Sequence, residues 1–449
     1  MVISQIDCNG NRCPAPFATA EGQRVLMVAF HYPPALASGT RRTLSFSCDL
    51  PEFGWEPILL TAHPRAHERR DPDQLAEIPP DIRVTRAFAL DAARHLAFRR
   101  RYSRLTAWPD RWASWWLGAV PAGLYLIRRY RPRVLWTTYP IPTALGIGLT
   151  LARLSGLPWV IDLRDPLVTS QHPPPELRES YLRLERKAVE RCTRIVVSTP
   201  GLQRFLAARY PHVPPEKWTV LPNGFDERIF RALVSPARVG RPNPEPLTLV
   251  HGGTLYIGDN ERNPAPFLRA LAALRDRGEV GPPHANSPRC IGLTVILRAT
   301  SQDQAIDAMI RKYDLTGMVV TAPAIPYRES IRESGAVDGL LLFQGEAYNH
   351  LIPAKLFEYL RACRPIFAMT GAEGDSARIL RETGLEPAAA LEDAAAIQPA
   401  LLQFLQRIRA GQAPLPDAAA VANYSRRLQA KKLATLFEEV TTPTMAFPL

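Results

Sequence analysis

Long apolar runs and secretion signals are both missing from this sequence of 449 residues. No segment approaches the roughly 20 consecutive apolar residues that a membrane-spanning helix needs. The longest apolar segment, Trp115 to Ile127, is too short and is interrupted by Pro121. Residues 1–22 lack the basic start and the apolar core of a signal peptide. We therefore expect a cytoplasmic protein.

Cysteine is scarce as well, and the six cysteines are too scattered for a disulfide framework. Cys8 and Cys13 have neither C-x-x-C spacing nor a neighbouring histidine, which argues against a zinc site. The Gly, Asn and Pro residues around them predict a disordered N-terminal head over residues 1–22. Three other cysteines lie in apolar patterns and are expected to be thiols of the core: Cys48, Cys192 and Cys363.

Acidic residues are outnumbered, since 55 Lys and Arg face 43 Asp and Glu and leave a net charge of +12. A basic chain calls for an anionic partner. No nucleic-acid-binding module accompanies the arginines, so we expect phosphate-bearing ligands and no nucleic acid. Two basic clusters, Arg99 to Arg104 and Arg128 to Arg133, flank the tryptophan-rich segment 108–116. This pattern fits either peripheral contact with an anionic membrane, at the inner face of the plasma membrane, or half-buried helix packing.

The length suits two domains of roughly 200 residues each. In the first half, short apolar runs typical of strands buried on both faces alternate with helical segments such as Leu145 to Leu154. Such alternation predicts βαβ units and a parallel, Rossmann-like sheet. The predicted strands are Arg24 to Phe30, Pro57 to Thr61, Val134 to Thr138, Trp159 to Asp162 and Ile195 to Ser198.

After a Pro-rich connector at 240–246 the alternation begins again. Helix starts are predicted at Asn263-Pro264 and at a capping box of Ser301 and Gln304. A last helix is expected over Asn423 to Val440. The predicted strands are Leu247 to His251, Leu293 to Leu297, Met318 to Thr321, Gly339 to Phe343 and Pro365 to Met369.

The chain is therefore predicted to be α/β, with two doubly wound domains facing each other across a cleft. Ligands bind such sheets at the carboxyl ends of the strands. The expected divisions are the head at 1–22, a first domain at 23–222, a second at 223–415 and a final segment at 416–449.

Two glycine-containing segments follow predicted strands. Gly39 precedes a helix that carries Arg41 and Arg42 in its first turns, where a phosphate would be favoured. Gly252-Gly253 ends the first strand of the second domain, and Arg262 follows in the same loop. Paired glycines leave room for a diphosphate, and an arginine can neutralise it. A plain turn in each place, with Arg262 as a solvated loop residue, remains the alternative.

A third segment begins a helix at Pro353 and presents Lys355 and Glu358 on one face of its first turns. Glu358 fits either of two roles. It could be a partner of the helix dipole, or it could accept both hydroxyls of a ribose with its two carboxylate oxygens.

The whole segment, PAKLFEYLRACRPI, resembles the nucleotide-sugar helix of the GT4 glycosyltransferases, a retaining family with the GT-B fold. Further segments resemble the same family in the right order, so that the likeness extends over about residues 24–440. These segments are HYPPALASGTRR, LPWVIDLRDP, LERKAVERCTRIVVST, VLPNGFDERIF and NYSRRLQAKKLATLFEEV. The resemblance implies a C-terminal helix that crosses back to the first domain.

The resemblance implies a glycosyltransferase that moves a sugar from a UDP- or GDP-sugar to a saccharide or lipid-linked acceptor with retention of configuration. The pathway would be exopolysaccharide, lipopolysaccharide or glycolipid synthesis. No cofactor is implied, and no metal, since the D-x-D pair of metal-dependent transferases is missing. The implied catalytic residues are Arg262, Lys355 and Asp165. The implied donor-binding residues are Gly39, Gly252, Gly253, Arg262, His350, Lys355, Leu356 and Glu358.

The sequence also departs from the family. A second glutamate expected eight positions before Glu358 is replaced by His350, and the usual Arg and Lys after Gly-Gly fall at Thr254 and Asp259. Three alternatives therefore stay open: a nucleotide-sugar epimerase, a phosphorylase and a non-catalytic partner in polysaccharide assembly. Asp165, expected at the acceptor site, could instead form a salt bridge with Arg164.

Overall fold

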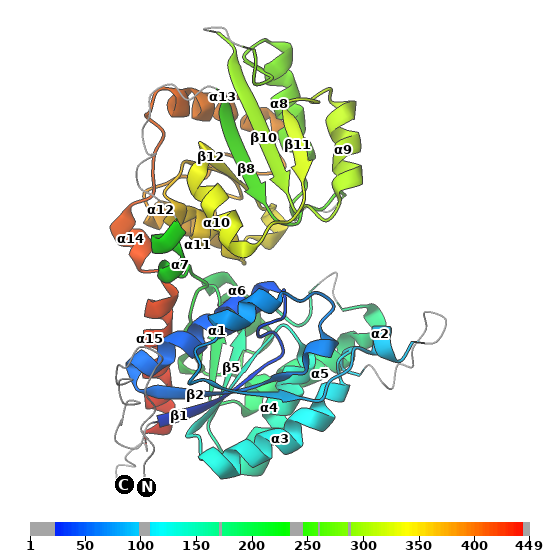
Figure 1. Ribbon diagram of the computed structural model, residues 1–449, viewed down its shortest axis with the longest axis vertical. Coiled ribbons are helices and arrows are strands. Elements are labelled where there is room, and N and C mark those ends of the chain that lie inside the picture. Colours follow the sequence, from blue (N-terminus) through cyan, green and yellow to red (C-terminus); the bar gives the residue numbers. More distant parts are fainter. Residues whose placement is uncertain are drawn as a thin grey trace, which may run out of the picture.

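The computed structural model describes residues 23–97, 108–169, 173–233, 246–258, 261–285 and 289–442. The N-terminal head at 1–22 with Cys8 and Cys13, the basic cluster Arg99 to Arg104, and Asp259 lie outside these residues. Figure 1 shows two α/β domains, one above the other, joined at their left side in that view.

The first domain is built on a parallel sheet with the strand order β3-β2-β1-β4-β5-β6-β7. The direction of winding reverses between β1 and β4. All five predicted strands are present, with ends within two residues of those expected. The strands are β1 (Gln23–Ala29), β2 (Trp55–Ala62), β3 (Arg83–Ala87), β4 (Val134–Thr138), β5 (Trp159–Leu163), β6 (Arg194–Val197) and β7 (Trp218–Val220).

The second domain repeats this plan with the order β11-β10-β8-β12-β13, and β9 pairs with β10. Its winding reverses at β8. The five predicted strands are again confirmed within two residues. The strands are β8 (Leu247–Gly252), β9 (Val280–Gly281), β10 (Ile291–Arg298), β11 (Val319–Ala322), β12 (Gly339–Phe343) and β13 (Ile366–Met369).

Helices cover both faces of each sheet, which confirms the doubly wound fold. In the first domain α3 to α6 bury one face, while α1 and α15 bury the other. In the second, α8, α9 and α13 lie against one face and α7 and α10 to α12 against the other. The helices of the first domain are α1 (Ser38–Asp49), α2 (Ala92–His95), α3 (Ser114–Tyr130), α4 (Pro142–Ser155), α5 (Pro175–Arg191) and α6 (Pro200–Arg209).

The helices that follow are α7 (Glu227–Leu233), α8 (Ala265–Asp276), α9 (Asp303–Lys312), α10 (Tyr327–Ala336), α11 (Ala354–Ala362), α12 (Asp375–Glu382), α13 (Ala394–Arg409), α14 (Ala418–Ala422) and α15 (Arg426–Thr441). Val421 of α14 belongs to the core of the second domain, whereas α15 packs on the first. The chain thus crosses back after α14, as expected for the last helix (Figure 1). The predicted domain boundaries at 222 and 415 stay predictions.

Three strands and one helix start were not predicted correctly. β3, β7 and β9 are edge or very short strands without a continuous apolar run, so the pattern used for the other strands does not detect them. The capping box at Ser301 is wrong, because α9 begins only at Asp303 and Ser301 has a left-handed φ of 63°. At α8 the Asn263 side chain does accept a hydrogen bond from the amide of Ala265, so Pro264 precedes the first helical residue.

Of the three thiols expected in the core, Cys192 is buried, whereas Cys48 and Cys363 are only half-buried. Cys363 ends α11 with a left-handed φ of 54°, which places it at a helix terminus. In the described part of the chain no helix combines the length and the apolar character needed to cross a bilayer.

A buried ion pair ties the first domain to the linker. The Arg42 guanidinium donates to both carboxylate oxygens of Asp162 at 2.8 and 3.0 Å, and also to the carbonyl oxygens of Leu221 and Pro222. Both side chains are almost fully buried. Asp162 is therefore a structural residue that fixes the chain where it leaves β7.

Replacing Asp162 by alanine should destabilise the first domain by about 3–5 kcal/mol, because Arg42 would be buried without a counter-charge. Its melting temperature should fall by roughly 6–20 °C. The control, Arg427→Ala, removes an exposed ion pair with Glu52 (65% and 46% exposed), which contributes about 0–1 kcal/mol. Equal losses of melting temperature in the two variants would contradict the structural role of Asp162.

Candidate active site

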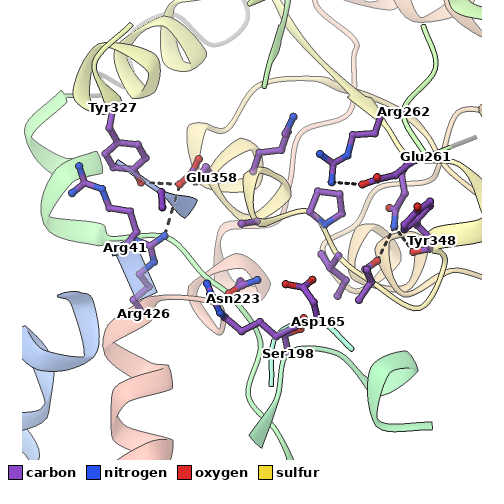
Figure 2. A pocket seen from close by; sticks show the side chains of 18 of the residues that line it. Arg41, Asp165, Ser198, Asn223, Glu261, Arg262, Tyr327, Tyr348, Glu358 and Arg426 are labelled. Carbon is purple, nitrogen blue, oxygen red and sulfur yellow. Dashed lines mark hydrogen bonds and ion pairs between the residues drawn. The ribbon is translucent and has the colours of Figure 1, made fainter. Parts of the chain in front are cut away.

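A pocket of about 520 Å³ lies between the two domains, at the carboxyl ends of both sheets (Figure 2). It therefore occupies the position where doubly wound sheets bind ligands. Both domains, the linker and α15 contribute to its wall. Its lining includes Arg41, Asp165, Arg262, Tyr327, Lys355, Glu358 and Arg426.

Glu358 lies on α11 with its carboxylate in this pocket. The Tyr327 hydroxyl donates a hydrogen bond to Glu358 Oε1 at 2.8 Å, and Arg426 Nη2 lies 3.9 Å from the same oxygen. Oε2 takes part in none of the hydrogen bonds found among the described residues. The carboxylate is thus held in place through one oxygen, while the other can accept hydrogen bonds from a ligand.

Tyr327 is also the point where the domains meet across the pocket. Arg41, from α1 of the first domain, lies over its ring at 4.2 Å from the centroid and pairs with Glu77. Burial raises the pKa of Tyr327, so its hydroxyl stays protonated and remains a donor to Glu358.

Lys355 lies one turn before Glu358 on α11 and contacts a buried histidine. His251 Nδ1 is 2.9 Å from the carbonyl oxygen of Leu341, so Nδ1 carries the ring proton and Nε2 is an acceptor. Lys355 Nζ lies 3.2 Å from that Nε2 and donates to it. Desolvation, with a smaller contribution from Arg262, lowers the pKa of Lys355 to about 7.

The Gly252-Gly253 turn lies against this lysine. A Cβ atom at Gly253 would come within 2.7 Å of Lys355 Nζ, and its φ is 117°, so only glycine fits there without strain. The amides of both glycines are bonded within the protein. The Gly252 amide donates to the Tyr359 hydroxyl and the Gly253 amide to the carbonyl of Arg298.

Arg262 lines the pocket and is 25% exposed, with its guanidinium 2.8 Å from the carboxylate of Glu261. Asp165 lines the opposite wall at the end of β5, with its carboxylate accessible to solvent in the cleft. The surrounding protein desolvates this carboxyl and raises its pKa, and Arg164, Arg262 and His350 oppose that effect.

The alternative salt bridge between Asp165 and Arg164 is not formed among the described residues. Arg164 instead donates from Nε to the carbonyl of Tyr139 at 2.8 Å. Its guanidinium packs against Gly39, where a Cβ atom would come within 2.7 Å. Gly39 lies inside the first turn of α1 and is not among the lining residues of the pocket, and its missing side chain makes room for Arg164.

Five of the expected donor-binding residues are not among the residues that line the pocket: Gly39, Gly252, Gly253, His350 and Leu356. Leu356 is fully buried in the core of the second domain. The ring of His350 stacks on Phe205 of α6 at 5.3 Å, and its carbonyl accepts a hydrogen bond from Thr199. His350 therefore lies in a contact between the domains beside the pocket.

Two residues that shape the pocket around Glu358, Tyr327 and Arg426, were not expected from the sequence, whereas Arg41 was expected near a phosphate at the start of its helix. Tyr327 follows Pro326 as the first residue of α10, and Arg426 follows the Ser425 cap of α15. The signal in the sequence that could have identified Tyr327 and Arg426 is an aromatic or basic residue directly after a helix cap.

The basic side chains that line the pocket are Arg41, Arg164, Arg262, Lys355 and Arg426, and its carboxylates are those of Asp165, Glu261 and Glu358. Such a set suits a ligand with a diphosphate and a neutral diol. Among the described residues no group of three His, Cys, Asp or Glu side chains lies together as a metal site.

Residues 39–224 match the family model of the glycosyl transferase 4-like domain. The structure is similar to sucrose-phosphate synthase of Thermosynechococcus elongatus (15% identity, TM-score 0.62, 93% of this chain and 99% of that one). It is also similar to HepE of Anabaena, solved with UDP and glucose (13% identity, TM-score 0.59, 93% of this chain and 100% of that one). A UDP-N-acetylglucosamine 2-epimerase shares the fold (10% identity, TM-score 0.55, 95% of this chain and 99% of that one). No curated protein sequence matches the chain.

Proposed function

We propose that this chain, a GT4-like glycosyltransferase with the GT-B fold, transfers a glycosyl group from a UDP- or GDP-sugar to an acceptor hydroxyl with retention of configuration. The acceptor is a saccharide or a lipid-linked saccharide of a surface polysaccharide or glycolipid pathway. The observation that carries the proposal is the Glu358 carboxylate, which faces the interdomain pocket with one oxygen held by Tyr327 and the other available to a ligand.

The donor lies along α11 in this proposal. Glu358 accepts hydrogen bonds from both ribose hydroxyls, and the base lies toward the loop before Tyr327. The diphosphate then reaches Lys355 and Arg262, which line the same pocket. The similarity to HepE, which was solved with UDP and glucose, supports a nucleotide donor.

In the reaction the bond between the anomeric carbon and the diphosphate oxygen breaks, and the acceptor oxygen bonds to that carbon on the same face. The acceptor proton passes to Asp165 or to the leaving diphosphate. Negative charge grows on the diphosphate, so the fixed cations Lys355 and Arg262 stabilise the transition state more than the ground state. This scheme needs no metal ion.

The similarity to a 2-epimerase makes epimerisation the second candidate. An assay of a nucleotide-sugar panel separates the two, because a transferase releases nucleoside diphosphate in proportion to the acceptor consumed. We expect that release to depend on an added saccharide or lipid-linked acceptor. Conversion of the nucleotide sugar to an epimer without any acceptor would replace the proposal, and no turnover of any donor would favour the non-catalytic alternative.

Glu358→Gln should weaken binding of the nucleoside diphosphate by about 1–3 kcal/mol, because the hydrogen bonds lose their charged acceptor. This corresponds to a rise in Kd of roughly 5- to 150-fold, measured by isothermal titration. Glu382→Gln is a matched control on α12, where the carboxylate pairs with Arg378 outside the pocket. An unchanged Kd for Glu358→Gln would remove this residue from the site.

Donor affinity should depend on the protonation of Lys355. Its pKa is about 7 in the empty pocket, and a bound diphosphate stabilises the ammonium and raises that pKa. Binding therefore takes up a proton above pH 7, and KM should rise by up to about tenfold per pH unit there. Lys355→Arg keeps the cation protonated throughout and should flatten the profile between pH 6 and 9. Identical profiles for both enzymes would exclude Lys355 as the titrating group.

A further inference from the structure

A second pocket of about 530 Å³ lies on the first domain among α3, α4 and α5 and shares no lining residue with the active site. Its wall is mostly apolar, with two basic side chains at one end. The lining residues used below are Trp108, Trp116, Gly146, Leu149, Arg183 and Lys187.

One residue in the wall of this pocket is a glycine whose presence packing does not explain. Gly146 lies inside α4, where glycine is unfavourable relative to alanine. A Cβ atom at this position would meet no atom within 4 Å. Two residues later, Gly148 is required by packing, since its Cβ would come within 2.5 Å of Thr137. The space beside Gly146 is therefore open, whereas the space beside Gly148 is filled by side chains of the sheet.

Two exposed tryptophans line this pocket. Trp108 is 61% exposed and Trp116 is 40% exposed. The Trp116 indole donates a hydrogen bond to the Thr150 hydroxyl at 3.1 Å, so its ring is fixed across α3 and α4. Exposed indole rings with a satisfied N–H are typical of surfaces that contact the boundary between lipid chains and headgroups.

Further apolar and aromatic side chains on the same two helices are exposed. Leu117, Tyr125 and Leu154 on α3 and α4 are each at least 60% exposed. These two helices contain no Asp or Glu, and both have arginines in their last turn. Figure 1 shows them at the lower side of the first domain, away from the second domain.

The basic residues of the pocket are available for an anion. Lys187 is exposed and forms no ion pair with any described residue. Arg183 is 58% exposed and lies 3.7 Å from Glu179, itself 82% exposed, so this pair is weak. A ligand that fills the pocket therefore places an apolar chain beside Trp116 and Gly146 and a negative group beside Arg183 and Lys187.

We propose that this face binds an anionic lipid of a bilayer surface, with one acyl chain in the pocket beside Gly146 and the lipid phosphate at Arg183 and Lys187. The charge complementarity selects this occupant. The apolar wall fits an acyl chain, and a zwitterionic lipid lacks the net negative charge that the basic end attracts.

The test measures partitioning of the full chain onto vesicles of phosphatidylcholine with and without phosphatidylglycerol. Gly146→Leu fills the pocket and should lower the partition coefficient on anionic vesicles at least tenfold. Gly146→Ala is the matched control, because it changes the same helix position by one methyl group and should bind like the wild type. Both variants should melt no lower than the wild type and should keep their turnover of a soluble donor.

A second pair of variants tests the phosphate contact. Arg183→Gln with Lys187→Gln should lower anionic binding, whereas Arg186→Gln with Arg191→Gln removes the same charge from α5 outside the pocket and should have a smaller effect. Bromine on the acyl chains should quench tryptophan fluorescence, and Trp108→Phe with Trp116→Phe should remove most of that quenching.

Three results would overturn the proposal. The first is vesicle binding by Gly146→Leu equal to that of the wild type. The second is equal binding to neutral and anionic vesicles. The third is self-association that Gly146→Leu abolishes without any vesicle binding, since the face would then bind a second copy of the chain.

Discussion

The Glu358 carboxylate lies where the second domain, the first domain and the crossing helix α15 meet. It accepts a hydrogen bond from Tyr327, whose ring lies under Arg41 of the other domain, and it lies near Arg426, the first residue of the helix that crosses back. This half-buried carboxylate thus lies against Tyr327 of the second domain and near Arg426 of the crossing helix, and the Tyr327 ring links it to Arg41 of the first domain. A ligand that bonds to Glu358 changes the charge balance at the junction of all three.

Most of the fold could be predicted because it depends on burial. Strands covered by helices on both faces must be apolar throughout, so runs such as Val134–Thr138 and Gly339–Phe343 were located directly. Edge strands have weaker constraints: β3 contains two arginines and still completes the sheet. Helix starts depend on side-chain geometry of single residues, which explains the error at Ser301.

The site was predicted less completely, because its residues depend on which side chains point into one cavity. Lys355 and Glu358 were expected on one face of the helix that became α11, and both line the pocket. Asp165 and Arg262 line the same pocket. Leu356 and His350 were implied by the family resemblance. Leu356 is buried in the core and the His350 ring stacks on Phe205, and neither lines the pocket. Contacts across domains, such as Arg41 with Tyr327, have no signal in a local pattern.

The central claim is that Glu358 binds the ribose of the donor. A crystal structure of the chain with its nucleoside diphosphate tests this most directly. The account predicts both ribose hydroxyls within hydrogen-bond distance of the Glu358 carboxylate and the diphosphate beside Lys355. A ribose bound elsewhere in the cleft, with Glu358 still paired only to Tyr327 and Arg426, would contradict it.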